Sequence, residues 1–270
     1  MAIQRHQGHA ALVDAVQFDK VQGSLVTDNI VNGPHIALYP EFWGTFGYEP
    51  RYVNRVPVKT FNCLINRVCR FRQTWFYQLI RRNLLDQGWV SFRLDSRLEP
   101  RGAALYDLNF QGNEIFHAEH LSMRHRVPFC NFHGDLDQVM VDSCVSLVIE
   151  TYFDRIDTIA LSEKIFRALQ LPRPFWLFAS PGAVAVLRQN GFDVWDDWID
   201  HSYDSEPNAV TRQVHILDQI QHWVHRGFSA TDLPELELRA KANRKLLQQF
   251  RQVWPDRLQQ VCQQLQTQPA

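Results

Sequence analysis

The sequence lacks a long apolar run. Its opening residues, MAIQRHQGHAALVDAV, include no stretch that could serve as a signal peptide, and no later segment approaches the length of a membrane span. We therefore expect a cytoplasmic protein without a membrane span. With 45% hydrophobic residues, the 270-residue chain is expected to be folded rather than disordered, because it can bury one large core or two modest ones.

Lysine is scarce, and the charges nearly cancel. Only five of the 28 basic residues are lysines, and the formal net charge is −1. Such a balance argues against a protein that works by nonspecific binding to nucleic acid. The other basic residues are arginines, whose planar guanidinium can pair with phosphate or carboxylate in two places at once. Individual arginines are therefore candidate anion ligands.

Cysteine offers no framework for a metal or for disulfides. The five cysteines are odd in number and scattered, and their spacings match no zinc knuckle. We interpret them as reduced core thiols of a cytosolic protein. They are Cys63, Cys69, Cys130, Cys144 and Cys262.

Strand and helix patterns alternate through the middle of the chain. The predicted elements are strands at 35–40, 59–66, 89–95, 144–151 and 174–180, a helix between the second and third of these, and helices at 162–170 and 182–190. Short connections between strand, helix and strand are typical of a parallel sheet. The pattern predicts an α/β fold with a Rossmann-like, doubly wound sheet, and FDVW (192–195) as a last short strand.

The chain divides into three predicted regions. Residues 55–205 form the Rossmann-like domain, and residues 1–54 form a short N-terminal segment with one strand and an aromatic loop. Residues 206–270 read as two amphipathic helices, the second at about 234–265, whose apolar stripes should pack back on the domain. The stretch 96–134 is harder to read, with a possible helix in NEIFHAEHL and a possible strand in MRHRVPFCNF.

Polar residues follow three of the predicted strands. In open α/β sheets, ligands bind beyond the carboxyl ends of the strands, where loops meet helix N-termini. Arg72 and Lys164 could clamp a diphosphate from two sides, and Glu163 could bind a ribose diol. Ser180 could cap a helix, and Gly182 could let a ligand approach the backbone. The candidate donor-binding residues are Asn66, Arg67, Arg72, Glu150, Ser162, Glu163, Lys164, Ser180 and Gly182.

Two segments carry a family resemblance. LSEKIFRAL, followed by a strand and GAVAVLRQNGFDVWDDWIDHSYD, resembles the donor-binding domain of the α1,3-fucosyltransferase family, whose members carry Thr-Glu-Lys at this helix start. FNCLINRVCRFRQTWFYQLI is similar to that family's strand ending in Asn, followed by an Arg and a Phe-Tyr-x-x-Leu helix. The chain also resembles uncharacterised glycosyltransferase-like proteins of phages and cyanobacteria.

The resemblance covers about residues 55–205 and implies a two-lobed glycosyltransferase with a nucleotide sugar as donor. It places the diphosphate on Arg72 and Lys164 and the ribose on Glu163, without a metal or another cofactor. Ser162 stands where the family usually has Thr. Only residues 1–54 precede the matched region, where the family has a full acceptor lobe. We therefore expect a reduced N-terminal lobe, with the acceptor side otherwise replaced or completed by the C-terminal helices. Neither fucose nor the acceptor follows from the resemblance.

An inverting transfer needs a carboxylate base beside the acceptor hydroxyl. We favour Glu41, in the aromatic loop after the first strand, with Asp135, Asp137 and Asp200 as rivals. Asp135-Leu136-Asp137 also has the Asp-x-Asp pattern by which some glycosyltransferases hold a divalent ion, which leaves metal binding as a less favoured alternative.

Two further groups of polar residues are open to interpretation. His117, His120, His125 and His133 lack the spacing of a metal site. DDWIDHSYD (196–204) is interpreted as a loop near the donor base or ribose, or as a solvated segment fixed by Trp195, Trp198 and Tyr203.

Two alternative functions stay open at this point. One is a DNA-modifying glycosyltransferase acting on hydroxymethylated bases, and the other is a non-catalytic nucleotide-binding or assembly protein. The acceptor could accordingly be a glycan, a protein or modified DNA. The arginines that would meet DNA phosphates are Arg67, Arg70, Arg81, Arg82, Arg124 and Arg126.

Overall fold

The computed structural model covers the centre of the chain and the helices that follow it. The described residues are 49–65, 70–92, 132–150, 153–154, 158–224 and 226–249. The backbone is also given for five short strands: β1 (Gln4–His6), β2 (His9–Ala11), β3 (Leu25–Thr27), β4 (His35–Leu38) and β7 (Phe129–Cys130).

The central sheet has five strands in the order β10-β8-β5-β6-β7. Four of them are parallel, and β7 pairs antiparallel with β6 at one edge. Every residue of β8 is buried, as expected of a strand covered on both faces. The parallel strands are β5 (Lys59–Ile65), β6 (Gly88–Phe92), β8 (Ser143–Ile149) and β10 (Phe175–Phe178). The predicted α/β class is confirmed, and the parallel strands are consistent with a Rossmann-like fold.

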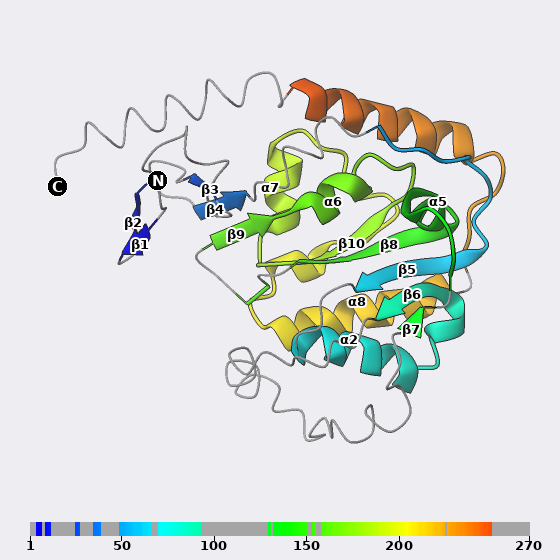
Figure 1. Cartoon of the computed structure of the whole chain (residues 1–270), viewed down its shortest axis with the longest axis horizontal. Coiled ribbons are helices and arrows are strands. Elements are labelled where there is room, and N and C mark those ends of the chain that lie inside the picture. Colours follow the sequence, from blue (N-terminus) through cyan, green and yellow to red (C-terminus); the bar gives the residue numbers. More distant parts are fainter. Residues whose placement is uncertain are drawn as a thin grey trace.

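Helices lie on both faces of this sheet (Figure 1). One face carries α2 (Arg70–Arg81) and α8 (Ala209–Trp223), which contact each other. The other face carries α5 (Leu136–Val141), α6 (Glu163–Ala168), α7 (Ala183–Gln189) and the helix formed by residues 233–249. The C-terminal helices therefore pack back on the α/β domain, as their apolar stripes predicted.

The strand order reverses between β5 and β8. From β5 the chain moves outward to β6, and it later continues on the other side of β5 with β8 and then β10. Ligands of open α/β sheets bind beyond the carboxyl ends of the strands at such a reversal. Glu150 directly follows β8, and α2 begins a few residues after β5. The reversal therefore brings two of the predicted site segments to one edge.

A second sheet of three strands, β3-β4-β9, adjoins the central one. β9 (Thr158–Leu161) pairs parallel with β4, and β4 pairs antiparallel with β3. β4 confirms most of the predicted strand 35–40, whereas β9 was not predicted. Because β4 belongs to the predicted N-terminal region and β9 to the Rossmann-like one, backbone pairing crosses the boundary drawn at residue 54.

The predicted helices and strands of the central region lie near the observed ones, but several details differ. The predicted strand FDVW is wrong: residues 192–195 have irregular backbone. The short helix α5 was not predicted. Val214, expected on the apolar face of α8, is 38% exposed, whereas Arg212 in that helix is buried. The predicted helix NEIFHAEHL lies outside the described residues, as do the final residues of the predicted helix 234–265.

Arg173 ties the segment that leads into β5 to the rest of the sheet. Its side chain is 1% exposed and donates to the carbonyl oxygens of Val141, Ser143, Pro172 and Arg55 and to Oδ1 of Asn54. Burial lowers the pKa of Arg173 to about 10. A buried guanidinium that is satisfied mainly by backbone carbonyls links three stretches of chain that are distant in sequence.

We predict that Arg173→Ala lowers the free energy of unfolding by about 3–5 kcal/mol, because several buried carbonyl groups lose their donor and a cavity is left. Urea denaturation monitored by circular dichroism measures the change. Arg188→Ala is the control, because its ion pair with Asp196 is exposed on both sides and should contribute less than about 1 kcal/mol. Equal losses in the two variants would contradict the role given to Arg173.

Candidate functional site

Glu150 is the centre of a cluster at the carboxyl edge of the sheet. The residue follows β8, and its side chain is 1% exposed. Its carboxylate accepts hydrogen bonds from the backbone N–H of Ser162 at 2.9 Å and from the Ser162 hydroxyl at 2.5 Å. Because Ser162 lies between β9 and α6, the carboxylate joins the end of one sheet to the end of the other.

Lys164 completes this cluster. Its Nζ lies 2.8 Å from Oγ of Ser162, 3.3 Å from Oε2 of Glu150 and 3.4 Å from Oε1 of Glu163. Ser162 also caps α6, because its Oγ accepts the N–H of Lys164. The structure thus brings together four of the predicted donor-binding residues: Glu150, Ser162, Glu163 and Lys164. We call these four residues the carboxyl-edge cluster.

The positive charge of the carboxyl-edge cluster, on Lys164, is already paired with carboxylates. Two carboxylates face one ammonium group, and the side chain of Lys164 is still 32% exposed. An anion that reaches Lys164 from solvent therefore has to share it with Glu150. A second positive charge at the same edge would favour such binding.

Arg72 is a candidate for that second charge. It lies in the first turn of α2, beyond the carboxyl end of β5, and it is 6% exposed. Arg72 lies close enough to act on Cys63 in β5. Burial raises the pKa of Cys63 to about 12, and the positive charge of Arg72 opposes this rise. Because β5 and β8 are neighbouring strands, Arg72 and Glu150 belong to the same edge of the sheet.

The N-terminus of α7 is not open to an external anion, contrary to our expectation for Ser180 and Gly182. Gly182, with φ of 83°, is the residue that precedes α7, and Ser180 does not cap it. The backbone N–H groups of Val184 and Ala185 donate instead to the two carboxylate oxygens of Asp204, at 3.1 and 3.0 Å. A carboxylate of the protein already occupies the position that a phosphate was expected to take.

The capping of α7 by Asp204 was not predicted, because Asp204 is distant from the start of α7 in sequence. It lies in the 3-10 helix η3 (Ser202–Ser205), and its backbone carbonyl also accepts the N–H of Gly182. Burial raises the pKa of Asp204, while its hydrogen bonds to Val184 and Ala185 oppose the rise. An isolated Asp twenty residues after a helix start gives no sequence signal for capping.

The Asp-x-Asp motif serves the fold. Asp135 caps α5 by accepting the N–H of Asp137 at 2.8 Å. Asp137 is 1% exposed, accepts the N–H of Arg51 and forms an ion pair with Arg167 at 3.1 Å. Among the described residues, no group of three or more His, Cys, Asp or Glu side chains is placed to hold a metal ion.

Several predicted residues lie outside the described residues, so their positions are not given. They are Glu41, Asn66, Arg67, His117, His120, His125, Arg124 and Arg126, together with the side chain of Arg70. Of the remaining residues considered for DNA contact, Arg82 forms an ion pair with Asp218 at 2.5 Å. His133 is exposed.

The acidic segment 196–204 is fixed by aromatic residues, which agrees with one of its two interpretations. Trp195 and Tyr203 are fully buried, and Trp198 packs on Phe228 with ring centroids 4.7 Å apart. Asp196 pairs with Arg188, whereas Asp200, a rival for the base, accepts the N–H and hydroxyl of Ser202. These carboxylates are engaged in holding the segment.

His201 takes part in a hydrogen-bond chain inside this segment. The N–H of Leu177 in β10 donates to the Tyr203 hydroxyl, which lies 2.9 Å from Nδ1 of His201. Nε2 of His201 lies 2.7 Å from the carbonyl oxygen of Val194. A neutral imidazole with its proton on Nε2 satisfies every donor and acceptor in this hydrogen-bond chain. Burial lowers the pKa of His201, which favours this neutral form.

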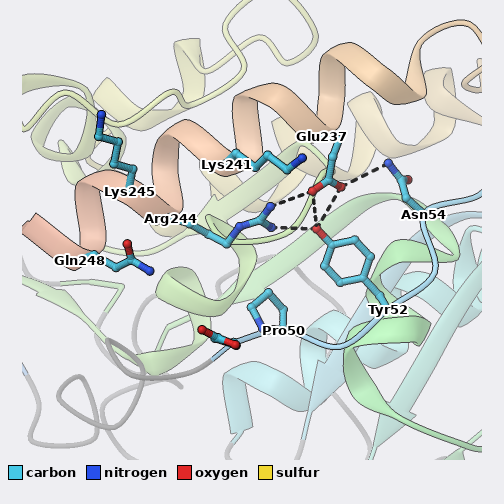
Figure 2. A pocket seen from close by; sticks show the side chains of 9 residues that line it. Pro50, Tyr52, Asn54, Glu237, Lys241, Arg244, Lys245 and Gln248 are labelled. Carbon is cyan, nitrogen blue, oxygen red and sulfur yellow. Dashed lines mark hydrogen bonds and ion pairs between the residues drawn. The ribbon is translucent and has the colours of Figure 1, made fainter.

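A hollow of about 620 Å³ lies apart from the carboxyl-edge cluster (Figure 2). The extended segment 49–54 forms one wall and the helix of residues 233–249 forms the other. Sequence patterns gave no indication of it, because its walls meet only in the folded chain. Its lining residues are Glu49, Pro50, Tyr52, Asn54, Glu237, Lys241, Arg244, Lys245 and Gln248.

Comparison of the chain with family models, curated proteins and solved structures gives no match. The interpretation of the site therefore rests on its geometry and on the resemblance carried by its motifs. Within the described residues, no helix has both the length and the apolar character needed to cross a bilayer.

We predict that Glu150→Ala lowers the free energy of unfolding by about 3–5 kcal/mol, because Ser162 loses its acceptor and Lys164 loses its buried partner. Glu150→Gln should lose less, since the amide retains an acceptor. Glu163→Gln is the control: this residue also pairs with Lys164, but its side chain is 43% exposed, so its loss should stay below about 1 kcal/mol. Similar values for Glu150→Ala and Glu163→Gln in denaturant titrations would refute the central position of Glu150.

We predict that acid weakens the fold partly through His201. Because its folded pKa is lowered, the unfolded state binds the proton more readily, and stability falls as the pH drops below the unfolded value of about 6.5. The slope is at most about 1.4 kcal/mol per pH unit and flattens below the folded pKa. His201→Gln, which retains a donor and an acceptor, should show a shallower decline between about pH 6.5 and 5. Parallel curves of unfolding free energy against pH would exclude this contribution.

Proposed function

We propose that the chain is a glycosyltransferase that takes a sugar from a nucleotide-sugar donor and holds the donor diphosphate without a metal. The observation that carries this proposal is the carboxyl-edge cluster, which lies where the strand order of a parallel sheet reverses. Nucleotides bind at this place in open α/β sheets. The resemblance of the Ser-Glu-Lys segment to the fucosyltransferase donor site supports the same assignment.

In this proposal Lys164 and Arg72 stabilise the leaving diphosphate. Because the side chain of Lys164 is 32% exposed, its ammonium group can bind a phosphate oxygen on the solvent side while it keeps its contacts with Glu150 and Ser162. Fixed positive charge in a partly buried site stabilises an anionic leaving group more strongly than it would in water. Arg72, from the neighbouring strand end, supplies the second charge.

The two carboxylates have different tasks. Glu150 is buried and holds the cluster together, so it contacts protein groups. Glu163 is 43% exposed and begins α6, so its carboxylate is accessible to the hydroxyl groups of a ribose. Ser180 and Gly182 are given no donor contact in this proposal, because the N–H groups of Gly182, Val184 and Ala185 donate to Asp204.

The acceptor side is assigned to the N-terminal region. β3 and β4 extend the sheet whose strand β9 leads to Ser162, and Leu38 at the end of β4 pairs with Leu161, so these two strands adjoin the donor edge. We propose a reduced lobe there, with Glu41 as the base and Asn66 and Arg67 as further donor contacts. The acceptor hydroxyl would then meet the donor sugar beside the β9 edge.

We predict that a nucleoside diphosphate or a nucleotide sugar stabilises the wild-type protein in a thermal-shift screen and that Lys164→Gln removes most of this effect. Ligand at a hundred times its dissociation constant adds about 2.7 kcal/mol to stability, which is a measurable shift. The screen covers UDP, GDP, CDP and dTDP and their sugars, with and without Mn²⁺. Lys59→Gln is the matched control, because Lys59 lies at the start of β5 and donates to the carbonyl of Asp86.

The outcomes separate donor binding from catalysis. If no nucleotide shifts the melting temperature, or if Lys164→Gln keeps the full shift, the donor site proposed here is wrong. A specific shift without hydrolysis or transfer of the bound sugar would instead favour a non-catalytic nucleotide-binding protein.

A further inference from the structure

The hollow between segment 49–54 and the helix of residues 233–249 has a hydrogen-bonded floor (Figure 2). The Tyr52 hydroxyl accepts a hydrogen bond from Arg244 at 2.7 Å and donates to Glu237, whose oxygens lie 3.0 and 3.1 Å away. Arg244 pairs with Glu237 at 2.7 Å. Burial raises the pKa of Tyr52 to about 12, so the phenol stays a donor at neutral pH. The floor carries no net charge.

Two lysines make the wall positive. Lys241 and Lys245 lie four residues apart on one helix, and both are exposed. Toward the described part of the chain, neither ammonium group forms a hydrogen bond or an ion pair, and no dashed line reaches either side chain in Figure 2. Like charges at this spacing destabilise a helix by a few tenths of a kcal/mol. Two of the five lysines in the sequence lie in this unfavourable arrangement.

The remaining lining offsets one of the two ammonium charges and leaves the hollow with an excess of one positive charge. Glu237 is committed to Arg244 and Tyr52, which leaves Glu49, at the end of segment 49–54, as the other carboxylate of the lining. Pro50 and the ring of Tyr52 supply apolar surface, and Gln248 and Asn54 supply amide groups. Positive wall, polar rim and a partly apolar floor together fit a small anion that carries an organic group.

We propose that this hollow binds a small organic phosphate. The ammonium groups of Lys241 and Lys245 point in different directions in Figure 2, but rotation of these exposed side chains on adjacent turns would bring both to one phosphate dianion. A volume of about 620 Å³ lies within the range of small-molecule sites. Inorganic phosphate alone would leave most of the hollow unfilled. The site is separate from the proposed donor site, because Arg244 bonds the carbonyl of Gln170 after the end of α6, whereas Lys164 lies at its start.

Isothermal titration calorimetry at low salt tests this proposal with glucose 1-phosphate as the probe. We expect saturable binding with a dissociation constant of about 1 mM or tighter, and weaker binding of inorganic phosphate and of glucose. The double variant Lys241→Gln/Lys245→Gln should bind at least about ten times more weakly, a loss of about 1.4 kcal/mol. Because both lysines are exposed and repel each other, its denaturation midpoint should equal or slightly exceed that of the wild type.

Two single variants separate this site from others. Lys164 does not line the hollow, so any part of the glucose 1-phosphate signal that Lys164→Gln removes belongs to the carboxyl edge. Lys59→Gln, which also removes one lysine elsewhere, should have no effect. Failure of nucleotide binding at the carboxyl edge would therefore leave this result untouched.

Three results would overturn the proposal. They are no saturable binding of glucose 1-phosphate, equal affinity in the double variant, or equal affinity for succinate, which carries two carboxylates in place of a phosphate. Equal affinity for inorganic phosphate would remove the organic part of the assignment.

Discussion

A buried carboxylate governs the organisation of the carboxyl edge. Burying a charge costs several kcal/mol unless it is paired and hydrogen-bonded, and Glu150 is satisfied only when Ser162 and Lys164 are in place. This requirement sets where β9 ends and where α6 begins relative to β8. The same requirement fixes the position of Lys164, whose ammonium group is partly exposed at this edge of the described structure. The proposed donor site is thus a consequence of how the fold neutralises Glu150.

The same principle explains why the second helix start is closed. The N-terminal N–H groups of α7 need an acceptor, and Asp204 supplies it from η3. Helix starts at the edge of an α/β sheet can serve a ligand or the protein itself. Here α6 is capped by Ser162, the residue directly before it, and Lys164 stays partly exposed. The start of α7 is instead capped by Asp204, a residue distant in sequence. The two junctions therefore differ in chemistry despite similar sequence patterns.

Most of the central sheet could be predicted from the sequence, because β8 is a continuous apolar run, CVSLVIET, and β6 alternates in burial as a strand does. The grouping of Glu150 with Ser162 and Lys164 followed from the rule that ligands bind at strand ends. Short β9 and α5 lack a long periodic signal and were missed. The capping by Asp204 and the hollow beside Tyr52 depend on contacts between distant segments, which no local pattern records.

The pairing of β4 with β9 has a consequence for how the protein folds. It joins residues 35–38 to residues 158–161, so a long intervening stretch must be closed into a loop before these strands meet. Closing so long a loop costs chain entropy, and topologies rich in such distant contacts fold slowly. Ser162 and Lys164 directly follow β9. β4 would therefore join the carboxyl edge late, after the central sheet has already formed.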